Sequence, residues 1–175
     1  LPGFFIDRTE VTARDYTACV SAGACRAPSC NSDTPQHPVV CVSWNDARDY
    51  CAWRGARLPS EREWEKAARG TDGRIWPTGN TPPTCTQANI SGCGVRAWPA
   101  GSQPGAASPY GALDMAGNVW EWTADWYDGA AQQDRVFRGG GWGVDARSAR
   151  ASNRGGLDPT RRFVRLGFRC ARAAD

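Results

Sequence analysis

The sequence predicts an α+β fold with little regular secondary structure, held together by disulfide bonds. The 175 residues include 20 Gly, 12 Pro and 9 Trp, a composition typical of irregular loops pinned by aromatic rings rather than of a helical bundle. The hydrophobic patterns are short, and eight cysteines are available for cross-links. A chain of this length buries most of its apolar surface in one core, so we expect a single domain over residues 1–175.

Short strands and three capped helices are predicted for the N-terminal part. Residues 4–6, 10–11 and 39–42 have the apolar, β-branched character of strands. Each predicted helix begins with a hydroxyl residue that is followed three positions later by a carboxylate, the pattern of a capping box. These pairs are Thr12 with Asp15, Ser43 with Asp46, and Ser60 with Glu63. Gly55 and Gly70 end the second and third helices.

The C-terminal part is predicted to consist of turns and strands and is rich in arginine. Residues 119–122, 135–138 and 166–171 have strand character, and turn residues dominate from residue 70 to residue 109. Residues 135–175 contain ten Arg and three Asp, whereas the rest of the chain has more acidic than basic residues. We expect these guanidinium groups to pair with the acidic part, and we do not expect a nucleic-acid groove.

The cysteines indicate the cellular compartment of the protein. They form an even set without the paired C-x-x-C motifs of a zinc site, which favours disulfides. Because disulfides persist in oxidising compartments, we expect a periplasmic, cell-surface or secreted protein. No stretch approaches the roughly 20 apolar residues of a membrane span. The Arg-rich, Lys-poor composition indicates a bacterial source.

Six segments, in order along nearly the whole chain, carry a family resemblance. They are residues 5–12 (FIDRTEVT), 38–47 (PVVCVSWNDA), 57–65 (RLPSEREWE), 110–122 (YGALDMAGNVWEW), 135–140 (RVFRGG) and 167–170 (GFRC). In these segments the chain resembles the formylglycine-generating enzyme, or sulfatase-modifying factor, family. The resemblance implies a C-type-lectin-like fold and two disulfides, Cys51 with Cys170 and Cys85 with Cys93. It leaves three possible pairings for the remaining cysteines, Cys19, Cys25, Cys30 and Cys41.

The residues that the family's oxidation chemistry needs are missing. In the family's enzymes, two cysteines after the Arg-Val-x-x-Gly-Gly motif hold copper(I) as thiolates, the soft ligands that copper(I) prefers. Here Val144 and Ala149 stand in that stretch, and no cysteine lies between Cys93 and Cys170. We therefore expect no copper and no formylglycine-generating activity. The related sulfoxide synthases hold iron with three histidines, whereas this chain has only His37.

The resemblance also implies two calcium sites. The first uses two acidic side chains and two backbone carbonyls, the oxygen ligands that calcium prefers, at the spacing of Asp114, Gly117, Val119 and Glu121. The alternative is that the two carboxylates pair with arginines. A second family site uses the Asn89 side chain and the Ile90 carbonyl, but the segment that supplies its other ligands is shortened here.

Residues 142–165 form the predicted binding surface. They lie between two family motifs, and they correspond to the ligand-contacting stretch of lectin-like variable proteins made by diversity-generating retroelements. Trp142 and Phe163 offer flat apolar faces. Donors and acceptors come from Asp145, Arg147, Arg150, Asn153, Arg154, Arg161, Arg162 and Arg165. We expect roughly half of these arginines to be structural.

These observations favour a non-catalytic, extracytoplasmic module that recognises a protein, a peptide or an anionic ligand through residues 142–165. Such a module is expected as a diversified variable protein or as the sensor domain of a larger receptor, for instance one fused to a kinase. Two alternatives stay open. One is a superfamily oxidoreductase or maturation factor with non-standard chemistry, which metal content discriminates from the binder. The other is an Arg-rich polyanion binder, whose affinity falls steeply with salt.

Overall fold

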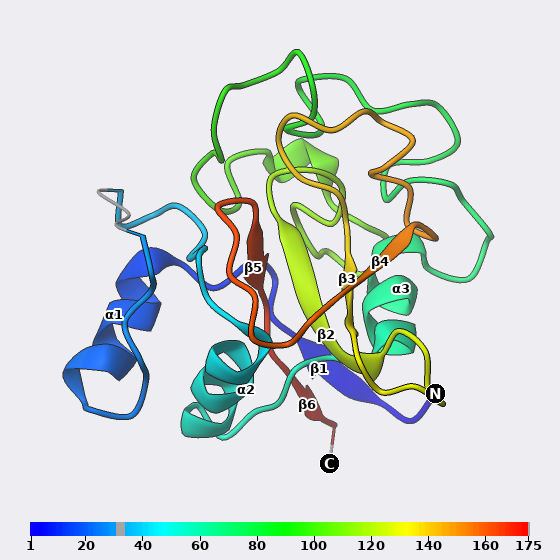
Figure 1. Ribbon diagram of the computed structural model, residues 1–175. Coiled ribbons are helices and arrows are strands. Elements are labelled where there is room, and N and C mark those ends of the chain that lie inside the picture. The colour runs from blue at the N-terminus through cyan, green and yellow to red at the C-terminus, as the bar shows by residue number, and fades with distance from the viewer. Residues whose placement is uncertain (31–33, 175) are drawn as a thin grey trace.

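A four-stranded sheet lies at the centre of the computed structural model, which describes residues 1–30 and 34–174 (Figure 1). The strand order is β4-β3-β2-β5. β2 (Trp120–Trp126) runs antiparallel to β3 (Arg135–Arg138) and parallel to β5 (Leu166–Phe168), and β3 runs antiparallel to β4 (Arg154–Leu157). A second, two-stranded sheet pairs β1 (Phe4–Ile6) with β6 (Ala171–Ala173), which brings the two ends of the described chain together.

Short helices supply the other regular structure of the described residues. They are α1 (Ala13–Ser21), α2 (Trp44–Trp53), α3 (Glu61–Arg69) and a 3-10 helix (Pro104–Ala106). In the view of Figure 1, α1 and α2 lie to the left of the central sheet and α3 lies to its right. Loops make up most of the remainder, so the predicted α+β fold with little regular secondary structure is confirmed. None of the helices in the described ranges is long and apolar enough to cross a bilayer.

The helices begin where the capping pattern predicts. At α2, Ser43 accepts the N–H of Asp46, and the Asp46 carboxylate accepts the N–H of Ser43 in return. The pair at the start of α3 is reciprocal in the same way. At α1, Thr12 accepts the N–H of Asp15, but its hydroxyl donates to the Asp15 carboxylate at 2.7 Å, so this box is half formed. Local hydrogen bonds therefore place all three helix starts.

The larger core cluster packs α1 and α2 against β2 and β5. Tyr16 and Tyr50 stack with their ring centroids 5.4 Å apart, and Phe168 makes a T-shaped contact with each of them. Trp122 is fully buried in the same cluster. A second cluster is built around Trp64 of α3. Together the two clusters make the sheet a fixed platform for the loops that follow β3 and β4.

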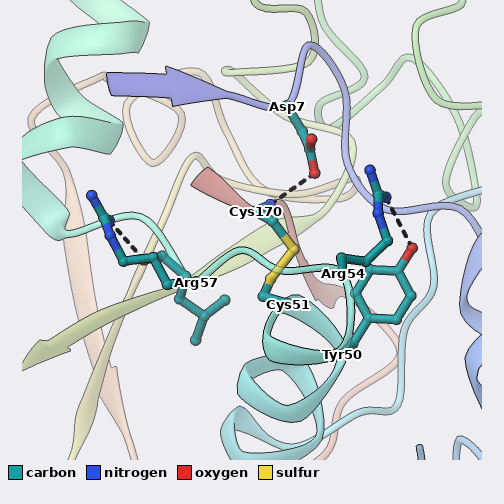
Figure 2. Close-up of a disulfide and its surroundings, with 7 residues drawn as sticks. Asp7, Tyr50, Cys51, Arg54, Arg57 and Cys170 are labelled. Atoms are coloured by element: carbon teal, nitrogen blue, oxygen red, sulfur yellow. Dashed lines mark hydrogen bonds between the residues drawn. A yellow bond between two sulfur atoms is a disulfide. The ribbon is translucent and has the colours of Figure 1, made fainter. Parts of the chain in front are cut away.

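Four disulfides cross-link the loops. Cys51–Cys170 ties α2 to the chain between β5 and β6, and the Asp7 carboxylate accepts the Cys170 N–H beside it (Figure 2). Cys85–Cys93 closes a loop, so both pairs that the resemblance implied are present. The four cysteines left open pair as Cys19–Cys25 and Cys30–Cys41. All eight cysteines are thereby oxidised, as in proteins of oxidising compartments.

Three strand predictions are wrong. Residues 10–11 form no strand, and Val11 instead makes single backbone hydrogen bonds to Phe168 and Val39. Residues 39–42 form none either, because Cys41 has a φ of 58°, which breaks an extended backbone. The strand expected over residues 166–171 is two strands, β5 and β6, in different sheets. The break falls where Arg169 turns into the core and Cys170 is bonded to Cys51.

Strand β4 has no signal in the sequence, because its Arg-Gly-Gly-Leu stretch has a low strand propensity. Close packing explains the two glycines. A Cβ at Gly155 would lie 2.2 Å from the ring of Phe137, and a Cβ at Gly156 would lie 2.6 Å from the side chain of Tyr127. Contact with aromatic rings, rather than intrinsic propensity, therefore decides this strand.

Candidate functional site

The segment 142–165 winds through turns after β3, returns as β4, and then leads by a loop to β5. It closes a hollow of about 260 Å³ against the sheet. The lining residues come from β2, β3, β4, β5 and the two loops, and they are Trp120, Phe137, Val144, Gly156, Leu157, Phe163, Arg165 and Leu166. A larger hollow of about 410 Å³ lies along β1, but none of the predicted site residues lines it. We therefore place the candidate site at the smaller hollow, where the predicted surface meets the sheet.

Aromatic rings form the walls of the hollow. Trp120 and Phe137 meet edge to face, with their centroids 5.0 Å apart. Phe137 can lie against β4 only because residue 155 is glycine. Phe163 stands at the rim with 44% of its surface exposed. The hollow thus offers an apolar floor and an accessible aromatic edge.

Of the described residues that line the hollow, Arg165 is the only charged one. Its guanidinium stacks over the ring of Trp142 at 4.0 Å from the centroid. A Cβ at Gly143, where φ is +83°, would lie 3.1 Å from the Arg165 Nη1, so glycine lets the guanidinium lie flat there. Within the described residues Arg165 forms no ion pair. The structure therefore places an ordered guanidinium group beside an apolar hollow.

The other predicted arginines divide into paired and outward groups. Arg154 forms two hydrogen bonds with Glu61, at 2.7 and 2.8 Å, and Arg162 forms an ion pair with Asp46 at 2.7 Å. Arg150 lies over the ring of Trp76 and Arg161 over that of Phe163. Arg147 is exposed. Two of the predicted binding arginines therefore serve internal ion pairs, which removes Arg154 and Arg162 from a free binding surface.

The remaining polar residues of the predicted surface shape its turns. The Asp145 carboxylate accepts the backbone N–H and the hydroxyl of Ser148, and these hydrogen bonds hold the pKa of Asp145 below its usual range. The Asn153 side chain donates to the Ser148 carbonyl at 2.7 Å. Both side chains are thus used locally, which leaves the hollow and Arg165 as the elements positioned for a ligand.

The two positions that correspond to the family's copper ligands are apolar. Val144 lines the hollow, and Ala149 is fully buried against Gly140. Since all eight cysteines are in disulfides, the chain has no thiol to contribute there. Across residues 1–30 and 34–174, no group of three or more His, Cys, Asp or Glu side chains is placed to hold a metal ion.

The carboxylates of the first calcium prediction lie in a buried cluster. Arg169 binds Glu121 through Nε and Nη2, each at 2.7 Å, and both side chains are fully buried. The Trp64 indole N–H also donates to Glu121. Asp114 accepts the N–H of Gly101 at 2.6 Å. For Glu121, the structure therefore shows the arginine pairing that was the alternative to calcium.

Excess negative charge remains in this cluster. Glu10 is also buried beside Asp114, and its Oε2 has no hydrogen-bond partner in the described structure. Burial, together with the charges of Asp114 and Glu121, raises the pKa of Glu10 well above its usual value. Three carboxylates thus face the single guanidinium of Arg169. A proton or a cation must neutralise the difference, although both oxygens of Glu121 already accept hydrogen bonds from Arg169.

The second calcium prediction has less support from geometry. Asn89 is buried, and its Oδ1 has no hydrogen-bond partner within the described residues, which fits an ion ligand. Its amide group donates to the Arg96 carbonyl. The Ile90 carbonyl already accepts the N–H of Cys93. This segment therefore offers one free buried oxygen and no carboxylate.

Sequence reasoning placed part of the lining within residues 142–165 but did not single out the residues that the central sheet contributes to the hollow. Trp120, Phe137 and Leu157 line it, although the first two were predicted only as strand residues and the third had no predicted element. The available signal is the alternation along a strand, which places Trp120 and Trp122 on the same face. Phe137 packs against both of them, at centroid distances of 5.0 and 6.3 Å.

Comparisons with known proteins agree on the scaffold. The sequence matches the sulfatase-modifying factor enzyme 1-like domain over residues 1–174. It is 44% identical over 158 residues to the Bos taurus protein named inactive C-alpha-formylglycine-generating enzyme 2, covering 79% of this chain and 51% of that protein. Hercynine oxygenase of Mycolicibacterium thermoresistibile is 38% identical over 161 residues, covering 78% and 36%. Treponema denticola variable protein 1 shares the fold, with a TM-score of 0.84, 23% identity, and coverage of 98% and 84%. The chain thus spans about half the length of the first relative and less of the second.

Proposed function

The chain belongs to the sulfatase-modifying factor enzyme 1-like domain family, and we propose that this member is a non-catalytic, extracytoplasmic module that binds a ligand through residues 142–165. One observation carries the proposal. Where the family's oxidation chemistry needs two thiolates, this chain has Val144 in the wall of an apolar hollow and a buried Ala149. An apolar hollow without a thiol suits binding and provides no group for copper-dependent oxidation.

Two further observations support a binder. The relative at 44% identity is named as inactive, and the same scaffold occurs in a variable protein. The four disulfides support an oxidising compartment, periplasmic, cell-surface or secreted. The ligand class is a protein, a peptide or an anion, and the module belongs to a larger receptor or to a diversified set of variable proteins.

A peptide library displayed on phage, panned against the purified domain, tests the proposal. Val144→Trp fills the hollow, whereas Val95→Trp adds the same ring at a site that is 88% exposed. We expect enriched peptides to bind the wild type and V95W and to lose affinity for V144W. Peptides that bind all three equally would place binding elsewhere. Conversion of a cysteinyl peptide to an aldehyde, with copper bound to the protein, would overturn the non-catalytic assignment.

The principal alternative is an oxidoreductase with non-standard chemistry, which the similarity to hercynine oxygenase favours. Metal analysis of the purified protein separates the two functions, because stoichiometric iron or copper supports the enzyme. A polyanion binder is the other alternative, and the exposed Arg147, Arg150 and Arg161 favour it. The affinity for a polyanion would fall steeply between low and high salt, whereas the affinity for a ligand in the hollow, which makes at most one or two ion pairs, would fall far less.

A structural calcium ion beside Asp114 and Glu121 is part of the proposal. When bound, calcium would neutralise the carboxylates that Arg169 leaves uncompensated, and Asp114, Glu121 and the carbonyls of Gly117 and Val119 would hold it. We expect calcium to raise the melting temperature above that in EDTA, by an amount corresponding to about 2.7 kcal/mol at one hundred times the Kd. Asp114→Asn should lose this response. Equal melting of the wild type in calcium and EDTA would show that protons neutralise the cluster.

A further inference from the structure

We infer that the hollow beneath residues 142–165 recognises a hydrophobic carboxylate, an apolar side chain or ring whose own carboxylate binds Arg165. This inference rests on the proposed function and narrows its ligand class. The chemistry is shared by the C-terminal residue of a peptide and by a free aromatic acid. The hollow and the arginine each contribute one half of the recognition.

The apolar half follows from the size and the walls of the hollow. Its volume of about 260 Å³ is just under the roughly 300–1,000 Å³ of typical small-molecule sites. The walls are the rings of Trp120 and Phe137 with the side chains of Val144 and Leu157. Such a space accommodates one ring or branched side chain and excludes a large cofactor.

The charged half of the recognition follows from the lack of an ion-pair partner for Arg165 among the described residues. The other guanidinium groups near this surface show what an arginine does here when a carboxylate is in reach, since Arg154 binds Glu61 and Arg162 binds Asp46. Arg165 has no such partner within the described residues, and no acidic residue lines the hollow. Arginine pairs with carboxylates through two parallel N–H donors, so its vacant edge suits a ligand carboxylate.

The stacking on Trp142 decides the direction of approach. One face of the Arg165 guanidinium is covered by the Trp142 ring at 4.0 Å, and Gly143 lies against the same group. A carboxylate must therefore approach the edge of the guanidinium, where its N–H groups point. Because stacking already orders the side chain, little rotamer entropy is lost when the anion binds. Arg161, which lies over Phe163 at the rim, adds a second positive charge.

Isothermal titration calorimetry with matched acids and amides tests the inference. The probes are N-acetyl-phenylalanine and its amide, a short peptide ending in Phe with a free or amidated C-terminus, and 3-phenylpropanoate. We expect the wild type to bind the acid at least about tenfold more tightly than the amide, as for a charge-assisted pair. Tight binding of the peptide acid alone would identify a C-terminus as the source, and equal binding of 3-phenylpropanoate would identify a free acid.

Two variants of equal charge supply the control. Arg165→Gln should abolish the preference for the acid, whereas Arg62→Gln, at an exposed position of α3 outside residues 142–165, should keep it. Val144→Trp should abolish binding of acid and amide alike, and circular dichroism checks that each variant is folded. Equal affinity of the wild type for acid and amide, or a preference that survives in R165Q, would overturn the inference. If phage peptides bind through the hollow without any need for a carboxylate, the inference fails while the proposed function stands.

Discussion

Replacing Arg169 by methionine tests whether the buried ion pair holds the fold together. All five N–H donors of Arg169 are used, two by Glu121 and one each by the carbonyls of Asp7, Arg8 and Leu113. Methionine fills a similar volume but donates nothing. The Arg169→Met variant would leave Glu121 fully buried with the Trp64 N–H as its one partner among the described residues, in a cluster that is already rich in carboxylates.

The expected loss of stability is about 3–5 kcal/mol, the usual cost of removing one partner from a buried pair. For a chain of this size that corresponds to a fall in melting temperature of roughly 6–20 °C. Urea unfolding at pH 7 under oxidising conditions, with EDTA present so that no cation takes the place of the guanidinium, measures the free energy directly. Far-UV circular dichroism follows the transition.

Arg154→Met provides the matched control, because Arg154 also forms a two-bond pair with a carboxylate, but at 38% exposure of its side chain. Exposed pairs contribute about 0.2–1 kcal/mol, so this variant should lose far less than R169M. The double variant Glu121→Gln with R169M should recover part of the loss, since the uncompensated charge is removed. If R169M were within about 1 kcal/mol of the wild type, or equal to R154M, the buried pair would not be a main support of this fold.

Three further results are expected. Replacing Cys51 and Cys170, which are 119 residues apart, by alanine should lower the free energy of unfolding in urea by about 5 kcal/mol, because the unfolded chain gains loop entropy. A decrease under about 1 kcal/mol would mean that packing alone joins α2 to the C-terminal strands. Gly155→Ala should lower stability by about 1–3 kcal/mol, because the new Cβ would lie 2.2 Å from an aromatic ring. The control Gly105→Ala, which has open space around the new Cβ, should change stability little, so equal melting temperatures of the two variants would contradict the packing argument. The pKa of Glu63 is lowered, mainly by its hydrogen bonds with a guanidinium. Its stabilisation is therefore complete above its ordinary pKa of 4.5 and is lost as the pH falls through the lower folded value. Glu63→Gln keeps the cap and should show a weaker loss of stability below pH 4.5, so parallel acid unfolding of the two proteins would refute this assignment.

Local hydrogen bonding explains which elements could be predicted from the sequence. A capping box joins residues three positions apart, so Ser43 and Ser60 mark helix starts whatever the rest of the chain does. β3 was equally visible, because its Arg-Val-Phe-Arg stretch contains a β-branched and an aromatic residue, both of which favour strands. Residues 39–42 have the same strand-like composition, yet Cys41 takes a left-handed φ in a turn that a disulfide closes. That constraint comes from outside the segment, so propensity could not reveal it.

The candidate site likewise has some features that the sequence predicts and others that depend on the folded structure. The residue types of the 142–165 surface and the lack of cysteine at Val144 and Ala149 are properties of the sequence, and no fold could supply the missing thiols. Which arginines are free is different, because it depends on carboxylates far away along the chain. Arg154 is paired with Glu61, 93 residues away, and only the folded structure brings them together.

The sequence by itself determined the family scaffold, the helix starts, the even set of cysteines and the absence of a redox pair, since each depends on residue identity or on short spacing. Tertiary structure alone decided the pairing of four cysteines, the existence of β4, the aromatic walls of the hollow and the lack of an ion-pair partner for Arg165 among the described residues. These features are set by distances between segments that are remote in sequence. Such distances follow from the packing of the whole core, which no local pattern records.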